Sequence, residues 1–469
     1  MKSSASRIIG LAVLIAFMAT WALPAFAVTQ KEELELGRQV HRQLAAQRVL
    51  FNDPTVDQYL RRVSNRVLKA AGPQGHPFHF YVIQSDGLNA FAVPGGYIYM
   101  HTETINSLQN EGQLAAILSH EVAHITSRHF ARRQEAGKMA SIASLAGVLA
   151  GALLAGGGGG GQNTAALGQA LMLGSVGASI QAMLANSRAD ETEADRKGRQ
   201  YMVKAGYNPR DMYGAFKIMN EMSYHISSET PNYLRTHPGL TARMASTFGD
   251  QANQAPSPPD PAYEAIRDRV LALSAQPRRA RSVFQKRLEK NPNDASAIHG
   301  LAMLAAREQS FAQANDLLEK ANKLAPNNAD YLSDLGDLAL RRRKIPEAIT
   351  FYEKSRSLNK GLSATLGLAR ALELSGKNKE ASPYYDEAVN MSGDDYPEAL
   401  ELAGRFFGQT GQMGKGHYLL SRYFGNIGQL KQAIFHCKAT IQDPAGGRYR
   451  KDCEQNIRDY EELMKDAKS

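Results

Sequence analysis

The segment Gln113–Arg128 has the sequence QLAAILSHEVAHITSR and contains the pentapeptide His120-Glu121-Val122-Ala123-His124. Apolar residues recur in it at intervals of three and four, which predicts a helix. On that helix His120 and His124 share one face, so both imidazole rings can reach a single metal ion. Glu121 can then act on a water molecule at the metal, which is the layout of a zinc hydrolase. The alternative is a surface helix with two solvated histidines, and a third ligand decides between them.

A candidate third ligand lies in the charged segment Ser187–Asp195, where another helix is predicted to begin. Glu191 and Asp195 are four residues apart and therefore share one face of that helix. We predict that Glu191 is the third zinc ligand and that Asp195 accepts a hydrogen bond from a ligand histidine, fixing its tautomer. The alternative is a solvated acidic first turn, which the helix dipole favours by itself.

In the predicted site, His120, His124 and Glu191 hold Zn²⁺ and leave one coordination position for water. The zinc ion would make that water more acidic and would polarise the scissile carbonyl. Glu121 would take the proton from the water and later deliver it to the leaving amine. The sequence therefore predicts peptide-bond hydrolysis with Glu121 as the catalytic base.

The residues that follow the second histidine narrow the type of metal site. A three-histidine site would need Gly and His three and six residues after His124, but these positions are Ser127 and Phe130. His129 lies off the face of the histidine pair and is predicted to be structural. The two-histidine, one-glutamate site is therefore favoured.

The composition is that of a globular protein with two or three domains: 469 residues, 43% hydrophobic and 22% charged. The net charge of +9 is spread along the chain. No long basic patch with interleaved aromatic residues occurs, so we expect no nucleic-acid partner.

Residues 1–27 have the pattern of a secretory signal peptide. Lys2 and Arg7 precede the apolar stretch Ile8–Leu23, and Ala25-Phe26-Ala27 fits the cleavage rule, so Val28 is expected to begin the mature chain. The alternative is an uncleaved membrane anchor. We predict export from the cytoplasm.

The region before the metal helix is predicted to be helical and then to form a small sheet. Apolar periodicity predicts helix over Gln30–Ala71, and Phe78–Ile83 and Tyr97–Met100 have the composition of strands. The free edge of such a sheet can hold an extended peptide through main-chain hydrogen bonds.

The segment between the two predicted halves of the metal site is unusual. Met139–Leu184 is almost uncharged and contains the six-glycine run Gly156–Gly161. It can form a glycine-hinged hairpin, a lid over the site or one facing a membrane. The alternatives are buried core helices and a bilayer-spanning hairpin, for which its arms are barely long enough.

Residues 256–262 are rich in proline and are predicted to be a linker. Beyond them a small-then-large pattern recurs every 33 or 34 residues, as tetratricopeptide helix pairs require. The repeating positions are Ala280, Ala314, Ala348 and Ala381, each followed four residues later by Phe284, Leu318, Tyr352 or Tyr385. Residues 263–469 are therefore predicted to form a solenoid with a concave binding surface.

Two cysteines, Cys437 and Cys453, lie sixteen residues apart near the end of the chain. For an exported protein this even pair predicts a disulfide that closes the last helical hairpin. Two free thiols are the alternative.

Together these motifs resemble the M48 zinc metallopeptidases, and in particular their periplasmic members with C-terminal tetratricopeptide repeats. The resemblance rests on the pentapeptide, on Glu191–Asp195, on Asn89–Gly96 and on Arg235-Thr236-His237-Pro238 followed by Arg243. It implies an α+β zincin-like domain, mostly α with a small sheet, over residues 28–255, followed by an all-α tetratricopeptide solenoid. It also implies that His237 is a regulatory fourth zinc ligand and that Arg243 supports substrate or transition state, whereas His237 can equally be a transition-state donor or a helix cap.

The functional expectation from this resemblance is a periplasmic zinc endopeptidase with a chaperone-like role in outer-membrane β-barrel assembly. Expected substrates are misfolded or misassembled outer-membrane proteins. The expected partner of the repeat domain is the β-barrel assembly machinery, with peripheral contact with the outer membrane. The alternative is a chaperone or adaptor that acts through its repeats and whose protease site is largely latent.

Overall fold

The computed structural model describes residues 28–135, 186–225, 233, 236–248, 255 and 257–466. The predicted signal peptide and the glycine-rich segment 139–184 lie outside these residues. Within the described residues, no helix is both long enough and apolar enough to cross a bilayer. The N-terminal region contains α2 (Gln30–Ala46), α3 (Pro54–Ala71), β1 (His79–Ile83), β2 (Ala90–Val93), β3 (Tyr97–His101), α4 (Thr102–Ser107), α5 (Glu111–Thr126), α6 (His129–Glu135), α9 (Arg188–Lys204), α10 (Arg210–His225) and α12 (Leu240–Phe248).

The helix predicted over Gln30–Ala71 is in fact two helices, α2 and α3. Asp53 caps the second helix, since its carboxylate accepts hydrogen bonds from the backbone N–H groups of Thr55 and Val56. Pro54 occupies the first turn, where a missing N–H costs nothing. Because these signals lie inside a continuous apolar pattern, periodicity alone did not locate the break.

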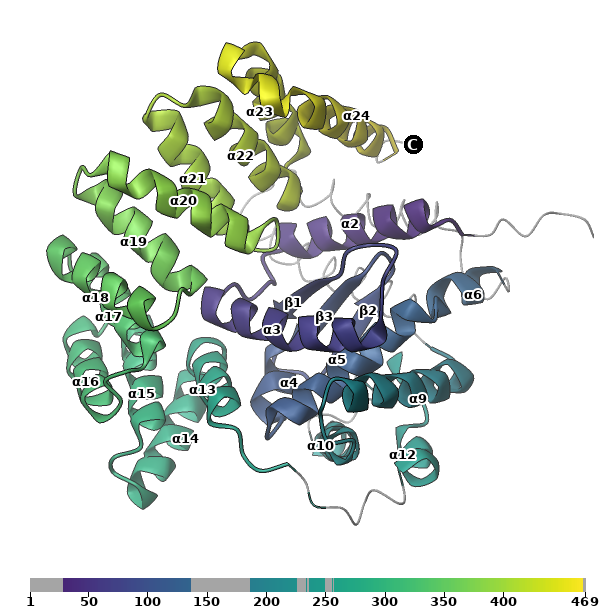
Figure 1. Ribbon diagram of the computed structural model, residues 1–469. Coiled ribbons are helices and arrows are strands. Elements are labelled where there is room, and N and C mark those ends of the chain that lie inside the picture. The colour runs from purple at the N-terminus through teal and green to yellow at the C-terminus, as the bar shows by residue number, and fades with distance from the viewer. Residues whose placement is uncertain are drawn as a thin grey trace, which may run out of the picture.

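The small sheet has three strands in the order β1-β3-β2, one more than predicted (Figure 1). Strand β3 pairs in parallel with β1 and antiparallel with β2, which leaves β2 at an edge. The turn between β2 and β3 uses Gly95 and Gly96 at φ of 82° and 90°, a conformation that favours glycine. The edge strand β2 packs on helix α5.

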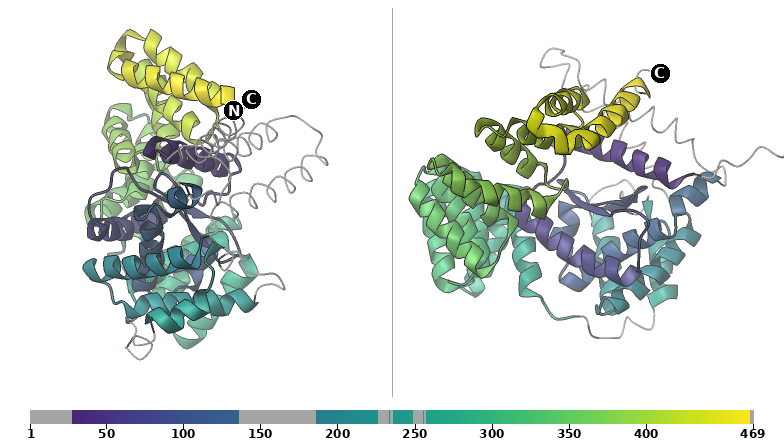
Figure 2. Two further views of the ribbon diagram at one scale, coloured as in Figure 1. Left: turned by 90° about the vertical axis from the view of Figure 1, so that its right-hand side faces the viewer. Right: turned by 45° about the horizontal axis from the view of Figure 1, so that its top comes forward.

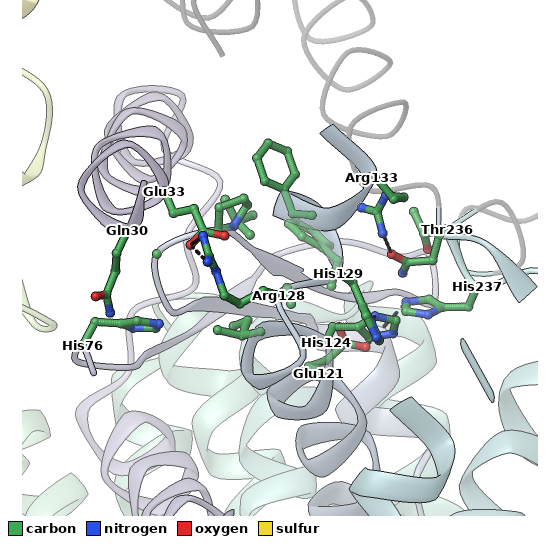
Figure 3. A pocket seen from close by; sticks show the side chains of 18 residues that line it. Gln30, Glu33, His76, Glu121, His124, Arg128, His129, Arg133, Thr236 and His237 are labelled. Atoms are coloured by element: carbon green, nitrogen blue, oxygen red, sulfur yellow. Dashed lines mark hydrogen bonds and ion pairs between the residues drawn. The ribbon is translucent and has the colours of Figure 1, made fainter. Parts of the chain in front are cut away.

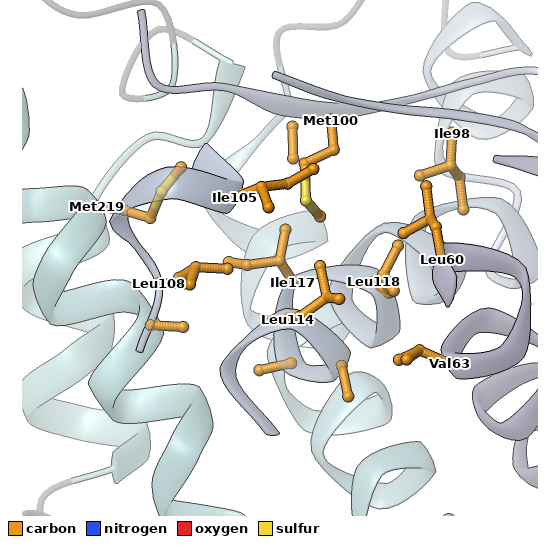
Figure 4. Packing of buried hydrophobic residues seen from close by; sticks show 14 of the residues in the cluster. Leu60, Val63, Ile98, Met100, Ile105, Leu108, Leu114, Ile117, Leu118 and Met219 are labelled. Atoms are coloured by element: carbon orange, nitrogen blue, oxygen red, sulfur yellow. The ribbon is translucent and has the colours of Figure 1, made fainter. Parts of the chain in front are cut away.

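The two faces of the sheet belong to two different hydrophobic clusters. Tyr99 is buried against residues of α2, whereas Ile98 and Met100 point to the other side. There they meet Leu114 and Ile117 of α5 in the main core (Figure 4). Helix α5 is buried from Glu111 to His124, so its histidines cannot be the solvated pair of the alternative interpretation.

The repeat region follows as helical hairpins that stack side by side. Their helices are α13 (Pro261–Ser274), α14 (Pro277–Lys290), α15 (Ala295–Arg307), α16 (Phe311–Leu324), α17 (Ala329–Arg341), α18 (Ile345–Leu358), α19 (Leu362–Leu374), α20 (Asn378–Ser392), α21 (Pro397–Gln409), α22 (Met413–Asn426), α23 (Leu430–Gln442), the 3₁₀ turn η2 (Pro444–Tyr449) and α24 (Arg450–Asp466). The predicted all-α solenoid is confirmed.

The repeated small and large residues are the contacts between these helices. Ala348 and Tyr352 of α18 are fully buried. The Tyr352 ring lies against two glycines, and a Cβ added at Gly336 or Gly367 would lie 2.6 or 2.4 Å from the ring. The 34-residue period therefore records where one helix crosses the next.

The predicted disulfide between Cys437 and Cys453 is not formed, because both residues are free, buried thiols. The stacking of α23 on α24 does bring them together. A hydrogen bond from Cys453 lowers the pKa of the Cys437 thiol. The sequence spacing thus predicted that the two cysteines lie close together. It could not predict a disulfide, because forming the bond also requires an oxidant.

The solenoid curves around the peptidase region, with α2 and α3 on the inside of the arc (Figures 1 and 2). Helix α13 begins within the predicted linker, at Pro261, and its Tyr263 donates a 2.7 Å hydrogen bond to the carbonyl of Ile105. Buried Arg269 of α13 pairs with Asp53 at 2.8 Å and with Asp334 of α17 at 2.8 Å. Part of the concave surface that we expected to bind partners is therefore occupied by the protein's own peptidase region.

Candidate metal centre

Helix α5 carries both histidines of the pentapeptide and begins at a well-defined cap. The side chain of Asn110 accepts a 2.8 Å hydrogen bond from the backbone N–H of Gln113. Three turns later His120 and His124 lie on the same side of the helix, with Nε2 atoms 3.0 Å apart. Both rings are buried.

Helix α9 crosses α5 closely and supplies the carboxylates. Its start is set by a capping box between Ser187 and Asp190. At Gly198 the helices are so close that an added Cβ would lie 3.1 Å from Cα of His120. This crossing places Glu191 Oε1 3.3 Å from Nε2 of His124.

A fourth group, His237, comes from the segment just before α12. Its Nδ1 lies 3.3 Å from Nε2 of His120 and 3.1 Å from Oε1 of Glu191. On its other side Nε2 lies 3.2 Å from the carbonyl oxygen of Ala90 in β2. The ring of the fully buried Tyr233 packs on the His237 ring at 4.5 Å.

The donor atoms of His120, His124, Glu191 and His237 form one buried cluster that could hold a metal ion. Tetrahedral ligands about 2.0–2.1 Å from zinc lie roughly 3.3 Å from one another. Five contacts within the cluster are 3.0 to 3.5 Å long, close to that value, and the four donor atoms all lie within 4.8 Å of one another. Two imidazoles, a carboxylate and a third imidazole are also a donor set that suits zinc. The residues present therefore fit the ion.

Glu121 lies beside the cluster as a buried carboxylate. It is 1% exposed, and neither carboxylate oxygen makes a hydrogen bond within the described part of the chain. Its Oε1 is 3.5 Å from Nε2 of His237. Burial raises the pKa of the Glu121 carboxyl above its ordinary range. A buried carboxylate without a donor is expected where water and a metal ion complete the site.

Asp195 and Arg243 surround the cluster as a second layer. Oδ1 of Asp195 is 3.1 Å from Nδ1 of His120, the nitrogen that faces away from the other ligands. The Arg243 guanidinium donates hydrogen bonds to both oxygens of Asp195, at 2.8 and 2.6 Å, and also bonds to Glu191. Arg243 thus holds both carboxylates of α9 in place.

The charges in this pocket keep Glu191 ionised. Burial alone would raise its pKa, but His237 and His124 hold the pKa of Glu191 well below its ordinary range. Burial lowers the pKa of His124 to about 3, so this ring is neutral and can offer a lone pair. Against the effect of burial, hydrogen bonds to Asp195 and Glu191 raise the pKa of His120 to about 9, so a metal ion would have to displace its proton. Glu191 thus offers the negative charge, and the neutral His124 a lone pair, that a dication requires.

A cavity of about 210 Å³ opens next to the cluster (Figure 3). Glu121, His124 and His237 lie at one end of it. The edge strand contributes Phe91, Ala92 and Val93 to its wall. Figure 3 shows Gln30 and His76 at the other end and Arg128 in between, where it forms an ion pair of 3.1 Å with Glu33.

The structure brings together every residue predicted for the site, and it adds His129. The Nδ1 of this residue lies 2.7 Å from Nδ1 of His124. Helical spacing missed it because α5 ends at Thr126 and the chain turns at Arg128, which has a φ of 50°. No spacing rule within one helix could have found this contact.

Two histidines on one helix, a glutamate on another and a buried glutamate directly after the first histidine define a metallopeptidase centre. Residues 54–247 match the model of Peptidase family M48, so the chain contains a domain of that family. Family M48 is zinc-dependent, in agreement with the donor set.

Relatives match mainly in this domain. The beta-barrel assembly-enhancing protease of Escherichia coli is 33% identical over 224 residues, which covers 48% of this chain and 44% of that protein. The mitochondrial metalloendopeptidase OMA1 of Schizosaccharomyces pombe is 27% identical over 186 residues, covering 40% of this chain and 50% of that protein. The matched part thus spans about half the length of these relatives. A solved tetratricopeptide protein, YrrB, aligns with a TM-score of 0.30 and 19% identity, covering 38% of this chain and 92% of that one.

Proposed function

We propose that this protein is a zinc-dependent endopeptidase of the periplasm that cleaves misfolded or misassembled outer-membrane proteins. The observation that supports it most is the buried cluster of three imidazoles and Glu191 beside the buried carboxylate of Glu121. The substrate class and the location extend the similarity to the beta-barrel assembly-enhancing protease. A chaperone-like role in β-barrel assembly, with the assembly machinery and the outer membrane as partners of the repeat region, belongs to the same proposal.

In the proposed reaction each residue has one task. His120, His124 and Glu191 would hold zinc, which supplies Lewis-acid activation of water and of the scissile carbonyl. Glu121 accepts a proton from the attacking water and donates it to the leaving amine. Asp195 fixes the tautomer of His120, and Arg243 keeps Asp195 and Glu191 in place.

The substrate is proposed to bind as an extended strand beside β2. This strand is at the sheet edge, and Phe91, Ala92 and Val93 line the cavity next to Glu121. Main-chain hydrogen bonds to an edge strand bind many sequences, which suits a protease for unfolded chains.

Glu121→Gln tests the proposal. The variant should bind zinc like the wild type but cleave an unfolded β-barrel protein on the order of 10²–10⁴-fold more slowly. Cleavage at the wild-type rate would exclude Glu121 as the base. The zinc content, measured on the same samples, separates loss of the base from loss of the metal.

The second candidate function is a chaperone or adaptor with a largely latent protease site. The position of His237 favours it, because this ring occupies the place of a fourth ligand. If neither the wild type nor His237→Ala cleaves any unfolded substrate while both contain zinc, the adaptor function is supported instead.

A further inference from the structure

His124 is in contact with a second histidine on the side that faces away from the metal cluster. Its Nδ1 lies 2.7 Å from Nδ1 of His129, the first residue of α6. The two rings are nearly perpendicular, at 76°, and both side chains are buried. The contact therefore has the length of a strong hydrogen bond in a place that is largely shielded from solvent.

Behind His129 lies a carboxylate of α9. Nε2 of His129 is 3.3 Å from Oε2 of Glu193. Glu193 is held in turn by Arg132 at 2.7 Å and by Lys197 at 2.8 Å. Asp190 lies near the same ring nitrogen, at 3.9 Å. A chain of contacts thus runs from His124 through His129 to Glu193.

The direction of these hydrogen bonds follows from the metal site. Nε2 of His124 faces the cluster, so it must be free of a proton to bind a metal. The neutral ring then carries its proton on Nδ1 and donates it to Nδ1 of His129. His129 must therefore carry its own proton on Nε2, which points at the Glu193 carboxylate. Only in this arrangement does the Nδ1–H of His124 meet an unprotonated nitrogen and the Nε2–H of His129 meet a carboxylate oxygen.

The two ligands of α5 are supported in different ways. His120 faces the carboxylate of Asp195 directly. His124 faces a histidine, with the carboxylate one step further away. Neither α5 nor α9 alone creates this second arrangement, because it depends on the turn at Arg128 between α5 and α6.

We propose that His129 is a positioning residue of the zinc site: it accepts the hydrogen bond that fixes the tautomer and orientation of His124, and Glu193 fixes the tautomer of His129. This inference rests on the proposed zinc site. Residues that orient a ligand histidine typically contribute roughly 10- to 100-fold in metal affinity.

Two variants separate the hydrogen bond from simple packing. His129→Leu removes the acceptor at similar size, whereas His129→Asn keeps an oxygen at the same distance from Cα as Nδ1. The measurements are the zinc dissociation constant, by competition with a chelator, and the thermal unfolding of the metal-free protein. We expect His129→Leu to bind zinc roughly 10- to 100-fold more weakly and His129→Asn to stay close to the wild type.

Other results would overturn the inference. Equal zinc affinity in His129→Leu and wild type, or an equal loss in both variants, would leave His129 as a packing residue. If His129→Leu does not fold, His129→Gln replaces it, because the Gln amide lies one bond too far from Cα to take the position of Nδ1. A zinc affinity of His129→Gln equal to that of His129→Asn would then reject the hydrogen bond. Absence of zinc from the wild type would instead reject the proposed function itself.

Glu193→Ala tests the outer contact. Glu193 is partly exposed and shares its charge with two cations. Removing the Glu193 carboxylate should therefore weaken zinc binding less than His129→Leu does, by roughly threefold. A loss as large as that of His129→Leu, or no loss, would contradict the proposed order of contacts.

Discussion

Nδ1 of His237 lies 3.1 Å from Oε1 of Glu191, across 46 residues of sequence. The same nitrogen lies 3.3 Å from Nε2 of His120, so His237 occupies the position of a fourth ligand. That position is the one a substrate water needs. With His237 as a fourth ligand, a metal ion in this site would have no open coordination position.

His237→Ala should open the site. We expect peptide cleavage to rise on the order of tenfold, which corresponds to removing about 1.4 kcal/mol of competing interaction. Initial rates on an unfolded substrate measure this, with His417→Ala in the repeat region as the control. A fall in rate at unchanged zinc content would show that His237 assists the reaction and does not block it.

Glu191→Gln should lose zinc, because the substitution removes the negative charge from the proposed ligand set His120, His124 and Glu191. We expect the dissociation constant to rise roughly 100-fold or more, and that of Asp195→Asn to rise roughly 10- to 100-fold. Metal analysis and chelator competition measure both, with the exposed Glu221→Gln as the matched control. Wild-type zinc content in Glu191→Gln would refute the ligand assignment.

Gly198→Ala should push helix α9, which carries Glu191, away from helix α5, which carries His120 and His124. The added methyl group would lie 3.1 Å from backbone atoms of His120, which cannot move independently of α5. We expect a loss of about 1–3 kcal/mol in the free energy of unfolding, together with weaker zinc binding. The control is Gly408→Ala in α21, where an added Cβ would have no neighbouring atom within 4 Å. This substitution should leave the free energy of unfolding unchanged or raise it by up to about 1 kcal/mol. Equal effects of the two substitutions would mean that the helix crossing is not tight.

Asp395→Asn should weaken the attachment of the repeats to the peptidase region. Asp395 accepts hydrogen bonds from His79 at 2.7 Å and Tyr81 at 3.1 Å, and it pairs with Arg61 at 3.0 Å. Its removal should cost on the order of 2 kcal/mol in the free energy of unfolding, measured with urea.

The contribution of Asp395 should also depend on pH. Burial opposes its ionisation, but His79 and Arg61 hold the pKa of Asp395 below its ordinary value of 3.8. A lowered pKa stabilises the folded state at pH values above 3.8, and this stabilisation is lost as the pH falls through the folded-state pKa. The difference between wild type and Asp395→Asn should therefore be constant near neutral pH and shrink only in acid. A difference that already disappears at pH 6 would assign the effect to another group.

Much of this protein could be predicted from local patterns. The pair His120 and His124 needs only a four-residue spacing on one helix, and Glu191 with Asp195 needs the same. The solenoid could be predicted because its contacts repeat every 34 residues, so that buried Ala348 and Tyr352 leave a periodic signal. Local geometry determines each of these features, and local geometry is what sequence spacing records.

Features that depend on how distant elements meet were decided by the tertiary structure. The turn at Arg128 brings His129 to His124, and the crossing at Gly198 sets the distance between the ligand helices. The solenoid places part of its inner face on α2 and α3 instead of leaving it open. The amino-acid sequence by itself thus determined which residues can bind a metal, because helical periodicity is a property of one segment. Only the tertiary structure brought His237 beside Glu191 and His129 beside His124, since both contacts arise from packing between segments that no spacing connects.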